Sequence, residues 1–207
     1  MRLDRRAVIA AAAASVAAPA LSAPAMAASL LASGDMSLGK ITAPVKVVEY
    51  ASLTCNHCAT FATEVFPAFK AKYIDTGRVH YTLKELLTDP QQVAAAGFLM
   101  ARCAGPGKYF DVVDAVFRSQ EQWGRTELRP LFNKIAADHG LTEAQFTACI
   151  QDEAALSALN ARGKRAVEVD KVTSTPTFFV NGRLAKAGVM SLAELDAAIA
   201  AAGPGGR

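Results

Sequence analysis

The run Val45-Lys46-Val47-Val48-Glu49-Tyr50 leads, after four further residues, into Cys55-Asn56-His57-Cys58, and this stretch decides the fold. The first part is short and rich in β-branched residues, which predicts a strand. From Asn56 to about Thr76 apolar residues recur at helical spacing until Gly77 ends the pattern. The stretch therefore predicts a strand that runs into a helix, with the cysteines at the point where the helix opens.

The segments that follow continue an alternating pattern. Residues 78–84 predict a second strand, which completes a strand, helix, strand unit of the kind that builds parallel sheets. Residues 89–171 show only helical patterns, interrupted by Gly105-Pro106-Gly107, and predict an all-helical insertion of several helices.

Strand character returns near the end of the chain. Residues 177–180 and 183–185 are joined by Asn181-Gly182, which is the strongest short signal for a hairpin. A last helix is predicted from the capping box of Ser191 and Glu194. The order is that of an α/β thioredoxin fold with an inserted all-helical subdomain, so that residues 45–88 and 172–203 form the thioredoxin-fold domain and residues 89–171 the insertion.

The first 27 residues predict a cleaved export signal, because a basic start precedes an Ala-rich apolar stretch and the small-residue pattern Ala25-Met26-Ala27. Arg5-Arg6 also fits a twin-arginine signal, and an ordinary secretory signal is the alternative. Residues 28–44 are expected to form a polar leader. Much of the formal net charge of +3 comes from arginines in the signal, and no basic and aromatic cluster indicates nucleic-acid binding.

The cysteine pair at a helix start predicts redox chemistry. Backbone N–H groups and the helix dipole favour a thiolate at Cys55, which is the reactive form of a cysteine. We expect Cys55 to be the exposed, attacked sulfur and Cys58 the buried, resolving one. His57 is expected to favour the Cys55 thiolate further, although an uninvolved surface histidine is the alternative reading.

The other two cysteines, Cys103 and Cys149, lie in separate helical segments. They do not form the second closely spaced pair that a structural zinc site needs, so no metal site is predicted. An even cysteine count in an exported protein favours a structural disulfide between them, with two buried thiols as the alternative.

These residues together resemble the DsbA-like thiol:disulfide oxidoreductases. The resemblance rests on Ala43-Pro44-Val45, on the run from Val48 to Cys58, on Arg102-Cys103 and on the run from Thr175 to Gly182. It implies a cis peptide at Pro176 beside the cysteines, and it implies that Glu49 and Lys84 form an acid and base pair beneath them. Charges inside apolar strands need partners if they are buried. The alternative is that both side chains point outward.

The resemblance also implies a function. We expect a monomeric periplasmic enzyme that oxidises cysteine pairs in unfolded or reduced exported proteins, needs no bound cofactor and is reoxidised by a DsbB-like membrane quinone reductase. Asn56 stands where the best-known members of the family have proline, and Thr175 where they have valine; both positions tune the redox potential. A disulfide isomerase or reductase with the same cysteines is the nearest alternative, and a non-enzymatic metal-binding thioredoxin-fold module is a second.

Overall fold

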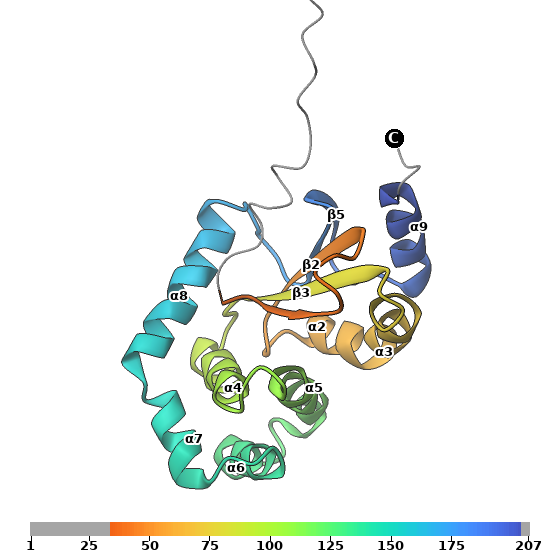
Figure 1. The fold of residues 1–207 in the computed structure, drawn as a ribbon. Coiled ribbons are helices and arrows are strands. Elements are labelled where there is room, and N and C mark those ends of the chain that lie inside the picture. Colours follow the sequence, from red (N-terminus) through yellow and green to blue (C-terminus); the bar gives the residue numbers. More distant parts are fainter. Residues whose placement is uncertain (1–33, 204–207) are drawn as a thin grey trace, which may run out of the picture.

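A five-stranded mixed sheet forms the centre of the computed structural model, which describes residues 34–203 (Figure 1). The strand order is β1-β3-β2-β4-β5, in which β2 and β3 are parallel and every other neighbouring pair is antiparallel. The predicted export signal and the first part of the leader lie outside the described residues. The strands are β1 (Met36–Leu38), β2 (Val45–Ala51), β3 (Val79–Glu85), β4 (Thr177–Val180) and β5 (Arg183–Ala187).

The helix that opens at the cysteines has the predicted extent but a mixed winding. It consists of α2 (Asn56–Thr60), a π-helical segment (Phe61–Val65), α3 (Phe66–Phe69) and a second π-helical segment (Lys70–Ile74). The π-helical segments flank the short α3, which carries Pro67. Because proline offers no N–H to the preceding turn, a change of winding next to it is one way for the chain to remain helical. Gly77, with φ +76°, lies in the turn that leads to β3.

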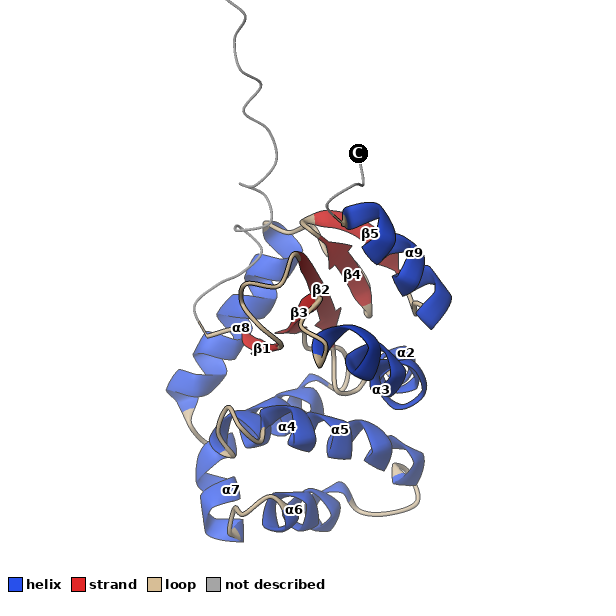
Figure 2. Cartoon of the chain, turned by 45° about the vertical axis from the view of Figure 1, so that its right-hand side comes forward, coloured by secondary structure: helices blue, strands red, loops and turns tan. Residues whose placement is uncertain are grey.

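The predicted all-helical insertion between β3 and β4 is confirmed. Most of it lies below the sheet in Figure 2, and α8 runs back up along the side of the sheet. Its members are α4 (Gln91–Cys103), α5 (Tyr109–Ser119), a 3₁₀ turn (Gln120–Gln122), α6 (Leu128–Asp138), α7 (Glu143–Ile150) and α8 (Glu153–Glu168). Within residues 34–203 no helix combines the length and apolar character that crossing a membrane requires.

Both faces of the central strands are covered, and the two faces have different partners. Val47 and Leu83 belong to the main core, which they share with the helix after the cysteines and with α4 and α5. Val48 and Tyr50 point to the other face, where they pack with Ala166 of α8 and residues near it. Strands buried on both faces are typical of the parallel part of an α/β sheet.

The C-terminal elements follow the sequence signals closely. The predicted hairpin is confirmed, with Asn181 and Gly182 at positive φ of 46° and 77° as a tight two-residue turn requires. The last helix, α9 (Leu192–Ala202), begins at the predicted capping box of Ser191 and Glu194. The short β1 lies within residues 28–44, for which the sequence predicts only a polar leader.

A buried ionic cluster attaches the insertion to the sheet. Glu85, at the end of β3, accepts hydrogen bonds from Arg102 of α4 at 2.7 and 2.8 Å and from Arg162 of α8 at 3.0 and 2.8 Å. The hydroxyl of Tyr109, from α5, donates to the same carboxylate at 2.9 Å. Three helices of the insertion therefore meet at one side chain of the strand that leads into them.

Candidate active site

Cys55 occupies the N-cap of α2, where its sulfur meets unpaired backbone donors. The Cys55 Sγ accepts a hydrogen bond from the backbone N–H of Cys58 at 3.3 Å, and the half-buried side chain remains reachable from solvent. Strand β2 ends four residues before Cys55, and α2 begins at the next residue, Asn56. The Cys-x-x-Cys spacing therefore places the Cys58 N–H in the first turn of the helix, within reach of the Cys55 sulfur. A sulfur in this position can carry a negative charge.

The pKa values of the two cysteines of the motif are shifted in opposite directions. Hydrogen bonds from Cys58, from the Thr175 side chain and from backbone N–H groups lower the pKa of Cys55 to about 5, although partial burial opposes them. Cys58 is completely buried, and burial together with the neighbouring Cys55 and Glu49 charges raises its pKa well above the ordinary value. At neutral pH the dithiol form therefore pairs a Cys55 thiolate with a Cys58 thiol.

His57 contributes to this asymmetry through its backbone. Its main-chain N–H is among the groups that lower the pKa of the Cys55 thiol, while its side chain is exposed. The same N–H also lies 2.9 Å from the side-chain oxygen of Asn56. An effect of the imidazole on the Cys55 thiolate stays a prediction.

The loop before β4 lies against the reactive sulfur. The Thr175-Pro176 peptide bond is cis, and the Thr175 carbonyl lies 3.4 Å from the Cys55 Sγ, where it accepts a hydrogen bond when Cys55 is a thiol. Pro176 is buried and Thr175 is half-buried. The structure thus brings Thr175 and Pro176, 120 residues along the chain from Cys55, to the position beside the cysteines that the resemblance implies.

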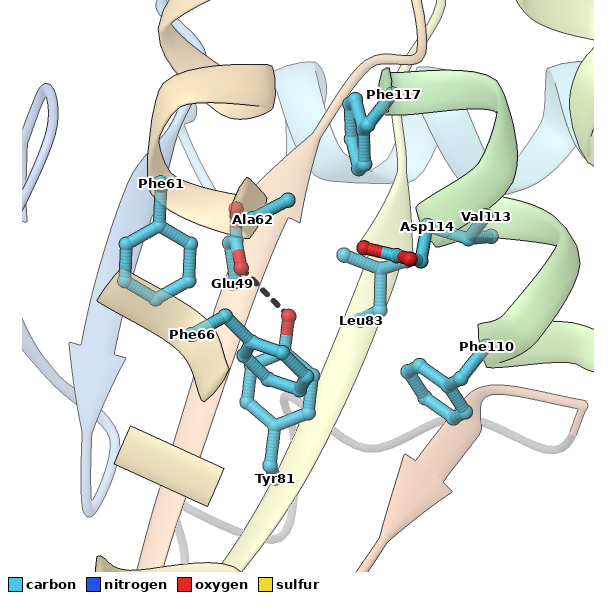
Figure 3. Close-up of a pocket in the computed structure, with 10 residues that line it drawn as sticks. All are labelled: Glu49, Phe61, Ala62, Phe66, Tyr81, Leu83, Phe110, Val113, Asp114 and Phe117. Carbon is cyan, nitrogen blue, oxygen red and sulfur yellow. Dashed lines mark hydrogen bonds between the residues drawn. The ribbon is translucent and has the colours of Figure 1, made fainter. Parts of the chain in front are cut away.

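Glu49 lies on the face of β2 that is covered by the helix after the cysteines. Its exposed fraction is 2%, and the hydroxyl of Tyr81 donates a hydrogen bond of 2.5 Å to its Oε2 (Figure 3). Burial raises the pKa of Glu49 to about 8, the Tyr81 hydrogen bond opposes this, and the charge of Cys55 adds to the rise. A carboxyl group that is neutral below about pH 8 and electrostatically coupled to both cysteines can exchange a proton during the reaction.

The predicted pairing of Glu49 with Lys84 is wrong. The parallel register of β2 and β3 sets Glu49 opposite Leu83, and consecutive side chains of a strand point to opposite faces, so Lys84 lies on the other face of the sheet. There its ammonium group is 3.0 Å from Asp35 and 5.7 Å from the centre of the Tyr50 ring. Both strand charges are buried with partners, but their partners are Tyr81 and Asp35.

The remaining cysteines lie in the insertion. Cys103, at the end of α4, and Cys149, in α7, form a disulfide that closes a separation of 46 residues. Among the residues that the structure describes, no group of three or more His, Cys, Asp or Glu side chains could hold a metal ion.

Two residues at the site had no clear sequence signal. Tyr81 looks like any apolar strand residue until the register places its hydroxyl against Glu49. Gln120, in the insertion, donates from Nε2 to the Leu53 carbonyl at 2.8 Å and to the Cys55 carbonyl at 3.5 Å. The insertion therefore contacts the backbone that presents the reactive sulfur.

Comparisons with known proteins agree with this geometry. A family model described as "Thioredoxin" matches residues 31–201. A Rickettsia bellii protein named "Putative protein-disulfide oxidoreductase" is 34% identical over 150 residues, which are 72% of this chain and 57% of that protein. This chain spans little more than half of the length of the Rickettsia relatives it matches.

Two solved structures are similar over nearly their whole length. The crystal structure of Wolbachia pipientis alpha-DsbA1 has a TM-score of 0.77 and 30% identity, covering 84% of this chain and 94% of that one. A protein-disulfide isomerase from Novosphingobium aromaticivorans has a TM-score of 0.70 and 26% identity, covering 83% and 98%. With a cysteine pair at a helix start, a cis-proline loop beside it and these relatives, the chain belongs to the DsbA-like family of the thioredoxin superfamily.

Proposed function

We propose that this protein is a periplasmic thiol:disulfide oxidoreductase that oxidises cysteine pairs in exported proteins through a disulfide between Cys55 and Cys58. The observation that carries the proposal is the contrast between the two sulfurs, a half-exposed Cys55 with a pKa of about 5 and a buried Cys58 with a raised pKa. A low pKa makes Cys55 a good leaving group and stabilises the reduced enzyme, so its disulfide readily accepts electrons.

The reaction begins with the disulfide form. A client thiolate attacks the Cys55 Sγ, the bond to Cys58 breaks, and Cys58 leaves as a thiolate that needs a proton. A second client thiolate then attacks its own sulfur in the mixed disulfide, and Cys55 leaves as a thiolate. The client gains one disulfide, the enzyme gains two electrons and keeps one proton, and the other client proton goes to solvent.

Glu49 supplies the proton for Cys58 in this scheme. Its carboxyl is protonated at neutral pH because burial raises the pKa to about 8, and it is coupled electrostatically to Cys58. The proton moves from the carboxyl to the leaving thiolate, and the resulting carboxylate is reprotonated before the next cycle. On reoxidation the same group removes the proton, so that the Cys58 thiolate can attack.

The family and the export signal predicted at residues 1–27 support a proposal for the clients, the redox partner and the location of the enzyme. The clients are unfolded or reduced exported proteins, and a DsbB-like membrane quinone reductase takes electrons from the reduced enzyme. The enzyme acts as a monomer, and the Cys55–Cys58 disulfide replaces a bound cofactor. The periplasm suits this chemistry because disulfides persist in oxidising compartments.

Equilibration of the Cys55–Cys58 pair with glutathione tests the direction of electron flow. We expect a potential well above the value near −270 mV that is typical of reducing thioredoxins. The matched control is a variant with both Cys103 and Cys149 changed to Ala, which leaves only the active pair to titrate. A potential at or below the thioredoxin value would overturn the proposal.

The nearest alternative function is disulfide isomerisation. Two observations favour it: the similar structure from Novosphingobium aromaticivorans is named a protein-disulfide isomerase, and Thr175 precedes the cis-proline in this chain. Incubation with a client that carries wrong disulfides distinguishes the two. An oxidase forms disulfides in a reduced client but restores activity to a scrambled one slowly. Efficient unscrambling would replace the oxidase with the isomerase, and stoichiometric metal on the reduced pair would instead favour a metal-binding module.

A further inference from the structure

A small cavity adjoins Glu49 on the side away from β4. Its volume is about 30 Å³, which is enough for a water molecule. Most of its wall is apolar, from Phe61, Phe66, Leu83 and side chains of α5, and the groups in its lining that can carry or exchange a proton are Glu49, Tyr81 and Asp114 (Figure 3). A proton that enters this cavity therefore has few possible carriers.

Tyr81 is held in one orientation at the inner end of the cavity. Its ring packs against Phe66, with 4.9 Å between the centroids, and against Phe69 and Phe110 at 6.0 and 6.1 Å. Its hydroxyl donates to the Oε2 of Glu49. Because Oε2 already accepts this hydrogen bond, the acid proton of neutral Glu49 belongs on Oε1.

Asp114 marks the outer end of the cavity. It comes from α5, on the wall opposite Glu49, and Figure 3 shows its carboxylate directed into the space between them. Its side chain is 45% exposed, and Arg118, one helical turn later, donates to its Oδ2 at 2.7 Å. One carboxyl group thus faces both the cavity and bulk water.

We propose that Glu49 exchanges its proton with solvent through this cavity, with Tyr81 as the positioning residue for the Glu49 carboxyl and Asp114 as the outer proton carrier. The inference rests on the proposed function, since it supplies the step that returns Glu49 to its starting state. The titratable groups that face or couple to Glu49 are Tyr81 from β3, Asp114 from α5 and the two cysteines at the start of α2.

The proton steps balance over one cycle. Glu49 gives a proton to the Cys58 thiolate and becomes a carboxylate. Asp114 then takes up a proton from solvent and passes it to a water in the cavity, and this water donates a proton to Glu49, which leaves Asp114 a carboxylate again. When the enzyme is reoxidised, Cys58 loses its proton to Glu49 and the same path runs outward. No electron moves along the path, so it changes rates without changing the disulfide potential.

Replacement of Asp114 by Asn tests the outer carrier. Reduced peptide is oxidised over many turnovers with glutathione disulfide as terminal oxidant, and a single reduction of the oxidised enzyme by dithiothreitol is timed separately. We expect multiple turnover to slow about tenfold, while the single reduction, which uses the proton already on Glu49, is unchanged. Added imidazole, a small diffusible proton carrier, should restore the lost turnover.

The matched control is Asp138→Asn. Asp138 also accepts from a cation four residues away on an exposed helix of the insertion, Lys134 at 2.8 Å, but it does not line the cavity. Equal turnover of the Asp114→Asn and Asp138→Asn variants would overturn the proposed outlet. If the unmodified protein itself failed to oxidise the peptide, the proposed function would fail instead.

Replacement of Tyr81 by Phe tests the positioning role. The protonated Glu49 carboxyl is followed by its infrared carbonyl band, assigned by its loss in Glu49→Gln, as the dithiol form is titrated. The Tyr81 hydrogen bond holds the pKa of Glu49 down, so its removal should move the midpoint upward from about 8. Tyr73→Phe removes a similar hydroxyl, bonded to Asp196 at 2.7 Å, and should leave the midpoint in place. Identical midpoints in both variants would contradict the assignment of Tyr81.

Discussion

The Cys55 thiolate should contribute to the stability of the dithiol form, and Cys55→Ser removes that contribution. The fold lowers the pKa of Cys55 from 9.0 to about 5. At about pH 7 the fraction of Cys55 that is thiolate is then roughly 100-fold larger in the folded chain than in the unfolded chain. This difference stabilises the folded state by about 2.7 kcal/mol. Because the side chain is only half-buried, solvent screening reduces this, and we expect about 1 to 2 kcal/mol.

The pH dependence of this stabilisation by the Cys55 thiolate provides an internal control for the assay. A depressed pKa stabilises the folded state fully above the unfolded value, and the contribution disappears as the pH falls through the folded value. Urea unfolding under reducing conditions at about pH 7 and about pH 5 should therefore show the gap between wild type and Cys55→Ser shrinking towards acid. Cys58→Ser keeps a side-chain donor for the Cys55 sulfur, so the effect of this variant on the free energy of unfolding should depend much less on pH than that of Cys55→Ser.

A gap between wild type and Cys55→Ser that is the same at both pH values would refute the reasoning. It would mean that the helix start and the Thr175 loop do not stabilise the thiolate. The driving force for oxidising clients would then have to come from destabilisation of the disulfide form, and the lowered pKa of Cys55 could not explain the proposed direction of electron flow.

Three further predictions concern contacts that attach the helical insertion to the sheet or stabilise the insertion itself. Glu85→Gln should lower the free energy of unfolding by about 2 to 3 kcal/mol, because two partly exposed arginines lose the charged partner that is buried between them, and urea unfolding measures this. Changing Cys103 and Cys149 together to Ala should cost about 2 to 4 kcal/mol in urea unfolding without reductant, while the rate of Cys55 alkylation stays as in the parent. Gly97→Ala should cost about 1 to 3 kcal/mol by thermal or urea unfolding, because the added methyl group would lie 2.7 Å from the Leu53 side chain.

Most of the fold could be predicted from the sequence because its elements carry strong local signals. The Asn181-Gly182 turn and the Ser191 capping box depend only on residues close to each other in the sequence, and both are present at the predicted positions. The strand β1 lacks such a signal, since its three residues gain their conformation only by pairing with β3. The π-helical winding around Pro67 was also beyond prediction, because a proline in a helical pattern indicates an interruption and leaves its form open.

The reactive cysteines of the site could be predicted from the sequence, whereas the partners of its buried charged residues could not. Buried strand charges need partners, and both have one: Glu49 pairs with Tyr81, and Lys84 pairs with Asp35. Glu49 and Lys84 do not pair with each other, because a one-residue difference in the register of parallel strands moves a side chain to the opposite face. The register of β2 and β3 depends on the whole core, and neither strand encodes it alone.

The contrast between the two cysteines follows from their spacing at the start of a helix, and this limits what the intervening residues can do. Position 55 faces the free N–H groups of the first turn, among them that of Cys58, whereas the next turn carries Cys58 itself into the core above Glu49. Substitution of Asn56 or His57 changes side chains that are exposed, while the backbone donors remain. Such substitutions should therefore tune the acidity of Cys55 without reversing the order of the two thiols.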